Sequence, residues 1–415
     1  MIIKPMIRNN ICLNSHPAGC EAVVLRQINY ARKHLASEYA APHSPRAGNC
    51  VAKFPTPQLT LVIGCSTGYG LASRIAVGFG YGAVTVGVSL ERPASQTKPG
   101  SPGFYNNQVF DREARQAGLV SITLDGDAFS DELKAEAVRA IQKAAEQAGI
   151  APKVDLVIYS LASPLRTCPK TGVSYRSVIK PIGQSYSGNT VDMLSGAVSE
   201  ITAQGATDEE IAATIKVMGG EDWELWINAL EKENVLSPNA RTVAYTYIGP
   251  ELSWPVYKNG TIGKAKEDLE RAARNINKKI AAWVSVNKAL VTRASVMIPV
   301  ISLYVSCLYK VMKEKNIHES CIQQIVRLFR DRLYTNASQS DPAQTPTDSE
   351  GRIRIDDLEM REDVQEETQK RIKMINAENV FSLSDLSGFR QDFMEIHGFD
   401  VEGINYETDV DPLGF

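Results

Sequence analysis

LTLVIGCSTGYG, residues 59–70, joins a short apolar run to a glycine-rich turn. The first five residues are apolar or β-branched, which is typical of a strand buried on both faces. The glycines of the second part allow the backbone to turn tightly and to approach a pyrophosphate closely. We expect a helix over residues 71–79, whose first N–H groups and positive dipole end would face that anion. A strand, a glycine-rich turn and a helix in this order favour dinucleotide binding over a plain strand-to-helix connection.

The segments that follow alternate between strand and helix patterns. Short apolar runs predict further buried strands, and Ser130 is a suitable N-cap for a helix that runs to about Gln147. Strands separated by helices indicate a parallel sheet. The predicted fold class is therefore α/β: a doubly wound, Rossmann-type parallel sheet with helices on both faces, elaborated by insertions and a helical C-terminal region. The further strands are predicted at residues 83–89, 119–124, 154–160 and 241–248.

We predict that the whole chain forms one large Rossmann-type domain. The region after Pro164 is rich in Gly, Pro, Ser and Thr and is interpreted as an insertion, with helices at 208–216 and 222–233. A long amphipathic helix is expected from Thr261 to about Val284, and a flexible loop over residues 335–351. The predicted segments are an N-terminal extension (1–58), a dinucleotide-binding half (59–163), an inserted elaboration (164–240), a catalytic and substrate segment (241–330) and a C-terminal helical region (331–415).

Charge and cysteine content narrow the class of protein. The 415 residues carry 48 acidic and 45 basic side chains, a formal net charge of −3, so a strongly basic nucleic-acid binder is excluded as the default. The seven cysteines are an odd number without a C-x-x-C pair, which disfavours a disulfide framework and favours the reducing cytoplasm. The most apolar stretch, residues 296–309, falls short of the roughly 18 residues of a membrane span, and we expect it to be buried or to line a pocket.

Glu91 closes the second predicted strand, about 20 residues beyond the glycine-rich turn. A carboxylate there can accept hydrogen bonds from both adenosine ribose hydroxyls and would repel a 2′-phosphate, which favours NAD over NADP. Arg92 beside it is the competing feature, because an arginine can accommodate that phosphate. Asp127 has two interpretations: it could lie beside the adenine, or it could cap the turn before Ser130.

The reduction of a carbonyl or an enoyl group needs a proton donor. Ordinary short-chain dehydrogenases use Tyr-x-x-x-Lys on one helix face, and neither Tyr247 nor Tyr257 has a lysine four positions on. The candidate lysines are Lys264 and Lys266. At about 100° per residue, Tyr257 and Lys264 would share a face of a continuous helix, whereas Lys266 would lie opposite. Glycines between Tyr257 and Lys264 interrupt that helix, so spacing alone only slightly prefers Lys264.

Motifs along nearly the whole chain carry a resemblance to a known family. The chain resembles the trans-2-enoyl-CoA reductase / enoyl-ACP reductase family, the large single-chain branch of the short-chain dehydrogenase/reductases. The motifs are Ile3-Lys-Pro, His16-Pro-x-Gly-Cys20, Gly64-Cys-Ser-Thr-Gly-Tyr-Gly70, Asp125-Gly-Asp-Ala-Phe129, Tyr159-Ser-Leu-Ala-Ser-Pro164, Val217-Met-Gly-Gly-Glu-Asp-Trp223, Tyr247-Ile-Gly249, Tyr257 with Lys266, and Val311-Met-Lys-Glu-Lys315.

The resemblance implies roles for individual positions. Tyr257 would be the proton donor, Lys266 its cofactor-binding partner, in place of Lys264, and Tyr247 a substrate contact. A lysine cation near a phenol of ordinary pKa ~10 favours the phenolate and so makes the phenol a better acid. The implied cofactor-binding residues are Gly64, Cys65, Ser66, Thr67, Gly68 and Tyr69 for the pyrophosphate, Leu90 and Glu91 for the ribose, Asp127 and Ala128 for the adenine, and Leu161, Ala162, Leu290, Val291 and Thr292 for the nicotinamide side.

The implied activity is the NADH-dependent reduction of the trans-2 double bond of enoyl thioesters in fatty acid synthesis, with coenzyme A or acyl carrier protein as the carrier. A noncatalytic NAD sensor or scaffold on the same fold is the alternative from another class. A ketoacyl reductase is the alternative among enzymes. We expect a monomer without bound metal, because the segment His318-Glu-Ser-Cys321 has no second ligand pair at suitable spacing.

Overall fold

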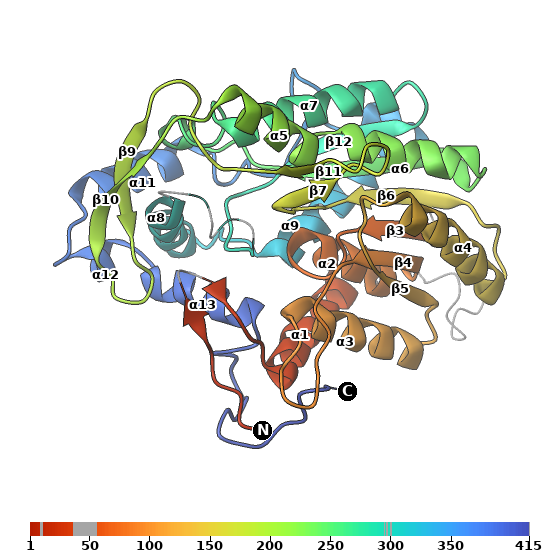
Figure 1. Ribbon diagram of the computed structural model, residues 1–415, viewed down its shortest axis with the longest axis horizontal. Helices are drawn as coiled ribbons and strands as arrows, with labels where there is room; N and C mark the ends of the chain where they lie inside the picture. The colour runs from red at the N-terminus through yellow and green to blue at the C-terminus, as the bar shows by residue number, and fades with distance from the viewer. Residues whose placement is uncertain (9–10, 36–55, 294, 296–297, 299–300, 415) are drawn as a thin grey trace.

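Seven parallel strands form one twisted sheet at the centre of the molecule, in the order β13-β12-β11-β6-β3-β4-β5 (Figure 1). The computed structural model describes residues 1–8, 11–35, 56–293, 295, 298 and 301–414. The order reverses between β3 and β6, as the doubly wound fold class requires. The strands are β3 (Leu59–Ile63), β4 (Val84–Ser89), β5 (Ser121–Asp125), β6 (Val154–Tyr159), β11 (Leu236–Thr246), β12 (Ala281–Val286) and β13 (Ile353–Arg354).

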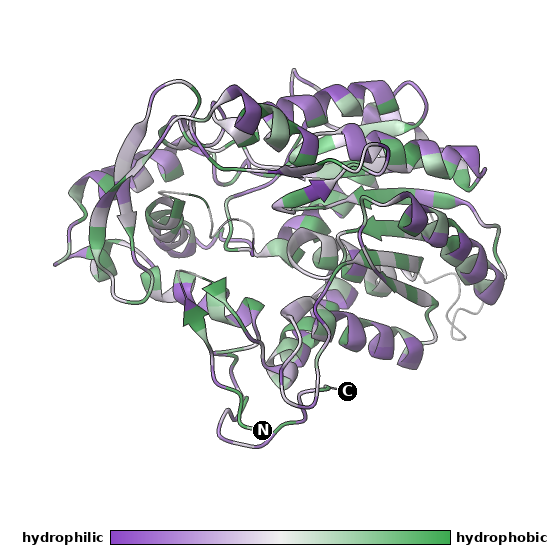
Figure 2. Ribbon diagram, viewed as in Figure 1, coloured by the Kyte–Doolittle hydropathy of each residue, from purple (hydrophilic) through white to green (hydrophobic). Residues whose placement is uncertain are grey.

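Helices cover both faces of the sheet, and each face has its own hydrophobic core. The hydrophobic residues of Figure 2 concentrate on the strands, while the outward sides of α3, α4 and α7 are hydrophilic. One face carries α1 (Pro17–Leu35), α2 (Gly68–Ile75), α3 (Pro102–Gln116) and α9 (Cys321–Leu328); the other carries α4 (Asp131–Ala148), α6 (Glu221–Lys232) and α7 (Thr261–Ile276).

Local sequence explains where these helices begin. The Ser130 hydroxyl accepts a hydrogen bond from the N–H of Leu133, which confirms its predicted role as the N-cap of α4. Thr207 and Glu210 form a capping box at the start of α5 (Asp208–Met218). Trp223 and Trp226 of α6 are fully buried and anchor that helix on the sheet.

Two predictions of secondary structure were wrong. The helix from Thr261 ends at Ile276, and residues 281–286 form strand β12, which pairs with β11 along its whole length. This run is apolar and almost entirely buried, so pairing within the sheet satisfies its backbone better than a helix extended beyond the core. Residues 335–351 were expected to be a flexible loop, yet they include α10 (Asn336–Ser340), which begins with a capping box at Thr335.

A third core lies beside the sheet, at the end of the molecule where β9, β10, α8 and α11 gather in Figure 1. Helix α8 is its centre, and its residues 301–309, which belong to the predicted apolar stretch, are mostly buried. Within the described part of the chain, no helix is long and apolar enough to cross a bilayer. The elements of this core are β9 (Tyr186–Val191), β10 (Val198–Ala203), α8 (Ile301–Glu314), α11 (Glu362–Met374), α12 (Val380–Leu383) and α13 (Leu386–Ile396), with β1 (Ile7–Arg8) and β2 (Ile11–Cys12) at the N-terminus. The hairpin of β7 (Leu165–Thr167) and β8 (Ser174–Arg176) packs against α5 instead.

Candidate active site

The expected site residues gather at the carboxyl ends of the parallel strands. The glycine-rich turn follows β3, Glu91 follows β4, Leu161 follows β6 and Tyr247 follows β11. In doubly wound sheets the connections leave β3 and β6 toward opposite faces and open a crevice between them, which is where ligands bind. The strand order therefore places the predicted dinucleotide turn at that switch point.

Close backbone packing makes two of the glycines indispensable. Gly64 has a φ of +86°, and a Cβ there would lie 2.4 Å from the carbonyl oxygen of Ser160. A Cβ at Gly70 would lie 1.9 Å from the carbonyl oxygen of Gly64. Thr67 is the N-cap of α2 but makes no side-chain capping bond, so the first N–H groups of the helix stay free for an anion. These features fit the pyrophosphate of a dinucleotide.

The side chains of the turn point in different directions. Cys65 is fully buried, and burial raises the pKa of its thiol, so it packs in the core and reaches the cofactor crevice only through its backbone. The Ser66 hydroxyl donates to Glu91 at 2.6 Å. The Tyr69 hydroxyl donates to the carbonyl oxygen of Lys288 at 3.0 Å, which joins the turn to the loop after β12.

Glu91 lies at the rim of the glycine-rich turn, but its carboxylate already has partners. Its two oxygens accept hydrogen bonds from the hydroxyls of Ser66 and Ser101, at 2.6 and 2.5 Å. Arg293 forms an ion pair with it at 3.1 Å, and the Glu91 side chain is only 7% exposed. Arg92, the competing residue, instead donates to the carbonyl oxygen of Leu13. A ribose at this position would share Glu91 with Arg293.

Leu90, Asp127 and Ala128 frame the expected adenine and ribose region. Leu90 is 69% exposed at the end of β4. The Asp127 carboxylate accepts from the N–H of Phe129 at 3.0 Å, so it stabilises its own turn, and the side chain is otherwise exposed. The buried Ala128 carbonyl accepts from Lys134 and from Trp226, which fixes the backbone here. The turn-capping interpretation of Asp127 is therefore observed, and the exposed side chain also leaves room for the adenine interpretation.

The residues expected on the nicotinamide side come from two strands. Leu161 and Ala162 follow β6 and are partly or fully exposed. Leu290 and Val291 follow β12 and are nearly buried, with 6% and 7% exposure. Thr292 reaches toward the glycine-rich turn, since a Cβ at Gly68 would meet its methyl group at 3.9 Å. The two loops thus face each other across the turn.

Tyr257 stands in a turn between a short 3₁₀ segment, Glu251–Ser253, and helix α7. The backbone folds back on itself here, because the N–H of Gly263 donates to the carbonyl oxygen of Tyr257. The Tyr257 ring is 9% exposed and lies edge-on to the ring of Tyr247. Among the described residues its hydroxyl has no hydrogen-bond partner. This hydroxyl is therefore available to a ligand.

The structure separates the two candidate lysines. Lys264 is exposed and pairs with Glu267 at 2.8 Å. Lys266 points inward, and its ammonium donates to the carbonyl oxygen of Tyr245 at 3.3 Å. Part of the Lys266 side chain reaches the surface, but the ammonium lies deep, and burial lowers its pKa to about 8. Lys266, and not Lys264, faces the crevice.

Burial also determines the ionisation state of the Tyr257 hydroxyl. Burial raises the pKa of Tyr257 above its ordinary value, and no charged group contributes to the shift. The Lys266 ammonium binds the backbone of β11 in this structure, so the expected lowering of the Tyr257 pKa by the lysine stays a prediction for the cofactor-bound enzyme. Tyr257 is thus a neutral phenol, the protonation state that a donor requires.

Sequence reasoning missed other polar groups beside these tyrosines. Glu359, of the segment between β13 and α11, accepts hydrogen bonds from Tyr247 at 3.0 Å and Tyr304 at 2.6 Å. Lys288 is 2% exposed in the loop after β12. No local pattern marks Glu359, because its partner Tyr247 is remote in the sequence. Lys288 stands directly after a buried strand, and that position was a usable signal.

A Tyr-x-x-x-Lys spacing was also overlooked, at Tyr309 and Lys313. Both residues are in α8, where the Tyr309 ring is fully buried and its hydroxyl accepts from the N–H of Val291 at 3.1 Å. Lys313 pairs with Asp385 at 2.6 Å. The pair therefore supports the Leu290–Thr292 loop and the packing of α13, and does not form a dehydrogenase dyad.

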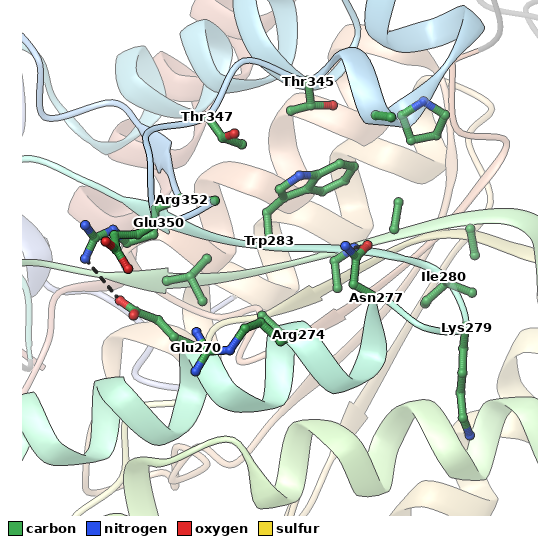
Figure 3. A pocket seen from close by; sticks show the side chains of 18 of the residues that line it. Glu270, Arg274, Asn277, Lys279, Ile280, Trp283, Thr345, Thr347, Glu350 and Arg352 are labelled. Carbon is green, nitrogen blue, oxygen red and sulfur yellow. Dashed lines mark hydrogen bonds and ion pairs between the residues drawn. The ribbon is translucent and has the colours of Figure 1, made fainter.

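One cavity lies at the opposite end of the strands. Figure 3 shows this cavity of about 500 Å³, which extends from the start of β12 and the end of α7 to residues 342–352. Trp283 and Arg274 line it, and Glu270 forms an ion pair with Arg352 there. None of the predicted site residues lines this cavity. The cavity is therefore separate from the carboxyl ends of the strands, where the predicted site residues lie.

A parallel sheet of this order, with a glycine-rich turn at its switch point and a tyrosine and a lysine beside it, defines a Rossmann-type oxidoreductase. Three family models match the chain. They are described as the catalytic region of trans-2-enoyl-CoA reductase (residues 98–334), the NAD(P)H binding domain of trans-2-enoyl-CoA reductase (residues 2–96) and the enoyl reductase FAD binding domain (residues 347–410).

Individual proteins are similar over the full length. Trans-2-enoyl-CoA reductase [NADH] of Treponema denticola is 54% identical, with 99% of both chains covered. Enoyl-[acyl-carrier-protein] reductase [NADH] of Coxiella burnetii is 51% identical, covering 99% of this chain and 96% of the other. The crystal structure of the Treponema denticola reductase in complex with NAD superposes with a TM-score of 0.90 at 53% identity, covering 99% and 98% of the two chains. The chain belongs to the trans-2-enoyl-CoA reductase family.

The flavin in one family description does not fit the residues present. Residues 347–410, all of which the structure describes, contain the two-residue strand β13 and helices α11, α12 and α13. No glycine-rich turn joins a strand to a helix in this range. Phe389 and Phe393 are instead buried against α8. The NADH of the two relatives' names fits the crevice, whereas we assign no flavin chemistry to the C-terminal segment.

Proposed function

We propose that Tyr257 and Lys266 are the catalytic residues with which this enzyme reduces the trans-2 double bond of enoyl thioesters. The observation that carries the proposal is the placement of Tyr257: a nearly buried, neutral phenol at the carboxyl ends of the strands, with its hydroxyl unpartnered among the described residues. NADH, when bound, supplies a hydride to the β-carbon of the enoyl group. All other steps belong to side chains of the protein.

Tyr257 acts on the thioester oxygen. Negative charge develops on that oxygen as the β-carbon is reduced, and a phenol that donates a hydrogen bond to it stabilises charge that exists only near the transition state. A proton delivered to the α-carbon then completes the saturation, and Tyr257 is the donor within reach. Because burial raises the pKa of Tyr257, the hydroxyl remains protonated at neutral pH. Tyr247 contacts the substrate beside it.

Lys266 serves the cofactor side of the site. Its ammonium points inward from the second turn of α7, where it can donate hydrogen bonds to the ribose nearest the nicotinamide. In the arrangement described, the carbonyl oxygen of Tyr245 holds the ammonium in place. Leu161, Ala162 and residues 290–292 line the nicotinamide side.

The remaining cofactor contacts follow the glycine-rich turn. Residues 64–69 hold the pyrophosphate, and the support for this is the excluded Cβ at Gly64 and Gly70 together with the free N-terminus of α2. Cys65 contributes its backbone only. Leu90 and Glu91 bind the adenosine ribose, and Asp127 with Ala128 borders the adenine. A carboxylate at the ribose favours NADH over NADPH.

The enoyl group can be carried by coenzyme A or by acyl carrier protein. The relatives carry names for coenzyme A and for acyl-carrier-protein thioesters, and the chemistry at Tyr257 is the same for both. We propose that the enzyme accepts the enoyl group from either carrier, in fatty acid synthesis in the cytoplasm. The six described cysteines are free, which supports a reducing compartment. We further propose that the enzyme acts as a monomer.

The test of the function is the loss of NADH absorbance when a crotonyl thioester is added. We expect turnover with both crotonyl-CoA and the crotonyl thioester of an acyl carrier protein, and steady-state kinetics with the two then measure carrier preference. An unchanged absorbance with both, in a protein that binds NADH, would support a noncatalytic sensor instead.

A further inference from the structure

A buried carboxylate, Glu359, connects the substrate side of the site to the cofactor side. Glu359 is 0% exposed, and its carboxylate accepts three hydrogen bonds. One oxygen accepts from the hydroxyls of Tyr247 and Tyr304, and the other accepts from the N–H of Ala289 at 2.7 Å. Tyr247 directly follows β11, and Ala289 belongs to the loop that leads into residues 290–292. A single side chain therefore holds two separate parts of the site.

The position of Glu359 is itself fixed by neighbours. The Gln365 amide donates both to the Glu359 carbonyl oxygen at 2.7 Å and to the Tyr304 hydroxyl at 3.1 Å. Burial raises the pKa of the Glu359 carboxyl, and the buried ammonium of Lys288 opposes that shift by favouring the ionised carboxylate. An ionised carboxylate is an acceptor only, so it suits the three donors that surround it. Burying an ionised carboxylate costs free energy, and a protein tolerates that cost when the carboxylate is fully hydrogen-bonded.

The arrangement fixes the direction of the Tyr247 hydroxyl. Its proton points to Glu359, so the ring cannot rotate freely, and the same ring meets Tyr257 edge-on at a centroid distance of 5.1 Å. A fixed Tyr247 ring limits the orientations of Tyr257. The effect of Glu359 on the reaction thus passes through Tyr247 and does not require contact with the substrate.

We propose that Glu359 is a positioning residue of the reductase, which aligns Tyr247, and through it Tyr257, with the loop that borders the nicotinamide. The inference rests on the proposed roles of Tyr247 and Tyr257. It also gives the C-terminal segment, which does not fit a flavin, a part in the reaction: it supplies the carboxylate that holds Tyr247 beside Tyr257.

The experiment is a double-mutant cycle of Glu359→Gln and Tyr247→Phe in the full-length enzyme, with kcat for a crotonyl thioester and the Kd of NADH as readouts. A glutamine cannot accept from the tyrosines and from Ala289 at once, because one end of its amide is a donor. We expect Glu359→Gln to lower kcat about tenfold while the Kd of NADH changes less than about threefold. In the Tyr247→Phe background the same substitution should cause a smaller loss of kcat, because only the contacts of Glu359 with Tyr304 and Ala289 remain to be lost.

Two variants complete the test. Glu362→Gln removes an exposed carboxylate from the first turn of α11 and should leave both readouts at the parental values. If Glu359→Gln does not fold, Glu359→Asp keeps the charge and enters the same cycle, with a smaller loss of kcat expected. A kcat of the single variant within about twofold of the parent, or a full additional loss in the Tyr247→Phe background, would overturn the proposal. Failure of the proposed function itself is recognised separately, because Tyr257→Phe would then retain its turnover.

Discussion

The rings of Tyr247 and Tyr257 meet edge to face, with centroids 5.1 Å apart and planes inclined at 72°. Tyr247 follows strand β11, and Tyr257 stands in the turn before α7, so the contact joins two elements of the site directly. Aromatic pairs of this geometry contribute about 0.5–1.5 kcal/mol beyond the area they bury. The contact therefore helps to hold the unpartnered Tyr257 hydroxyl in a defined position.

The first prediction concerns the two lysines of α7. Lys266→Ala should weaken NADH binding and lower turnover strongly, at least about tenfold each, because its ammonium faces the crevice. Lys264→Ala is the matched control: its ammonium is exposed, pairs only with Glu267, and should leave both quantities near parental values. NADH titrations and steady-state kinetics of both variants measure the two effects. A strong loss of turnover and NADH affinity in Lys264→Ala would show that Lys264, the lysine favoured by uninterrupted helical spacing from Tyr257, binds the cofactor.

The second prediction concerns the choice of cofactor. The parental enzyme should have a higher kcat/KM with NADH than with NADPH, because the Glu91 carboxylate repels a 2′-phosphate. Glu91→Ala should narrow the ratio of the two kcat/KM values by at least about tenfold. Arg92→Ala should not change the ratio, since that guanidinium binds Leu13 instead. A parental preference for NADPH would mean that Arg92 governs the ribose site.

The third prediction is a pH dependence. Burial lowers the pKa of Lys266 to about 8, so its cation is present below that pH and is lost above it. The kcat/KM for NADH should therefore be level below pH 8 and fall as pH rises through it. Lys266→Arg should move this fall to higher pH, because a guanidinium remains charged. If the fall near pH 8 persists in that variant, Lys288, whose pKa burial also lowers to about 8, is the group responsible.

The fourth prediction concerns the glycine-rich turn. Gly70→Ala places a methyl group where the carbonyl oxygen of Gly64 already lies, 1.9 Å away, so the turn must open. We expect NADH affinity to fall more than about tenfold. Gly78→Ala, in the π-helical segment Ala76–Gly80 that follows α2, is the control outside the turn. Its added methyl would press on a Phe110 ring carbon at 3.2 Å, so it strains the core but leaves the glycine-rich turn unchanged. Equal NADH affinity of Gly70→Ala and the parent would exclude a close backbone approach to the pyrophosphate.

Local patterns predicted most of the sheet. Residues 59–63 and 154–160 are short runs of mostly apolar residues next to glycine or serine turns, and such runs have few alternatives to a buried strand. Residues 281–286 were missed because they directly extend an amphipathic helix, and Ala-Ala-Trp fits either period. Only their place between β11 and β13 makes them a strand.

The site was predictable where its residues are close in sequence. The glycine-rich turn and Glu91 follow adjacent strands, and their order implied their proximity. Lys266 could not be chosen from spacing, because the backbone reversal at Gly263 changes the phase of the helix relative to Tyr257. Glu359 and Arg293 reach the site through contacts between remote segments, and no local periodicity reports such contacts.

The turnover of Tyr257→Phe with a crotonyl thioester, measured beside its NADH affinity, tests the central claim most directly. The substitution removes one hydroxyl, which is unpartnered among the described residues, so the fold and the cofactor crevice should be unaffected. We predict a loss of kcat of about a hundredfold or more, with a parental Kd for NADH, because the lost group acts on the substrate oxygen alone. Tyr186→Phe on β9 should behave as the parent. Turnover of Tyr257→Phe within about threefold of the parent would contradict the assignment of Tyr257 as the proton donor.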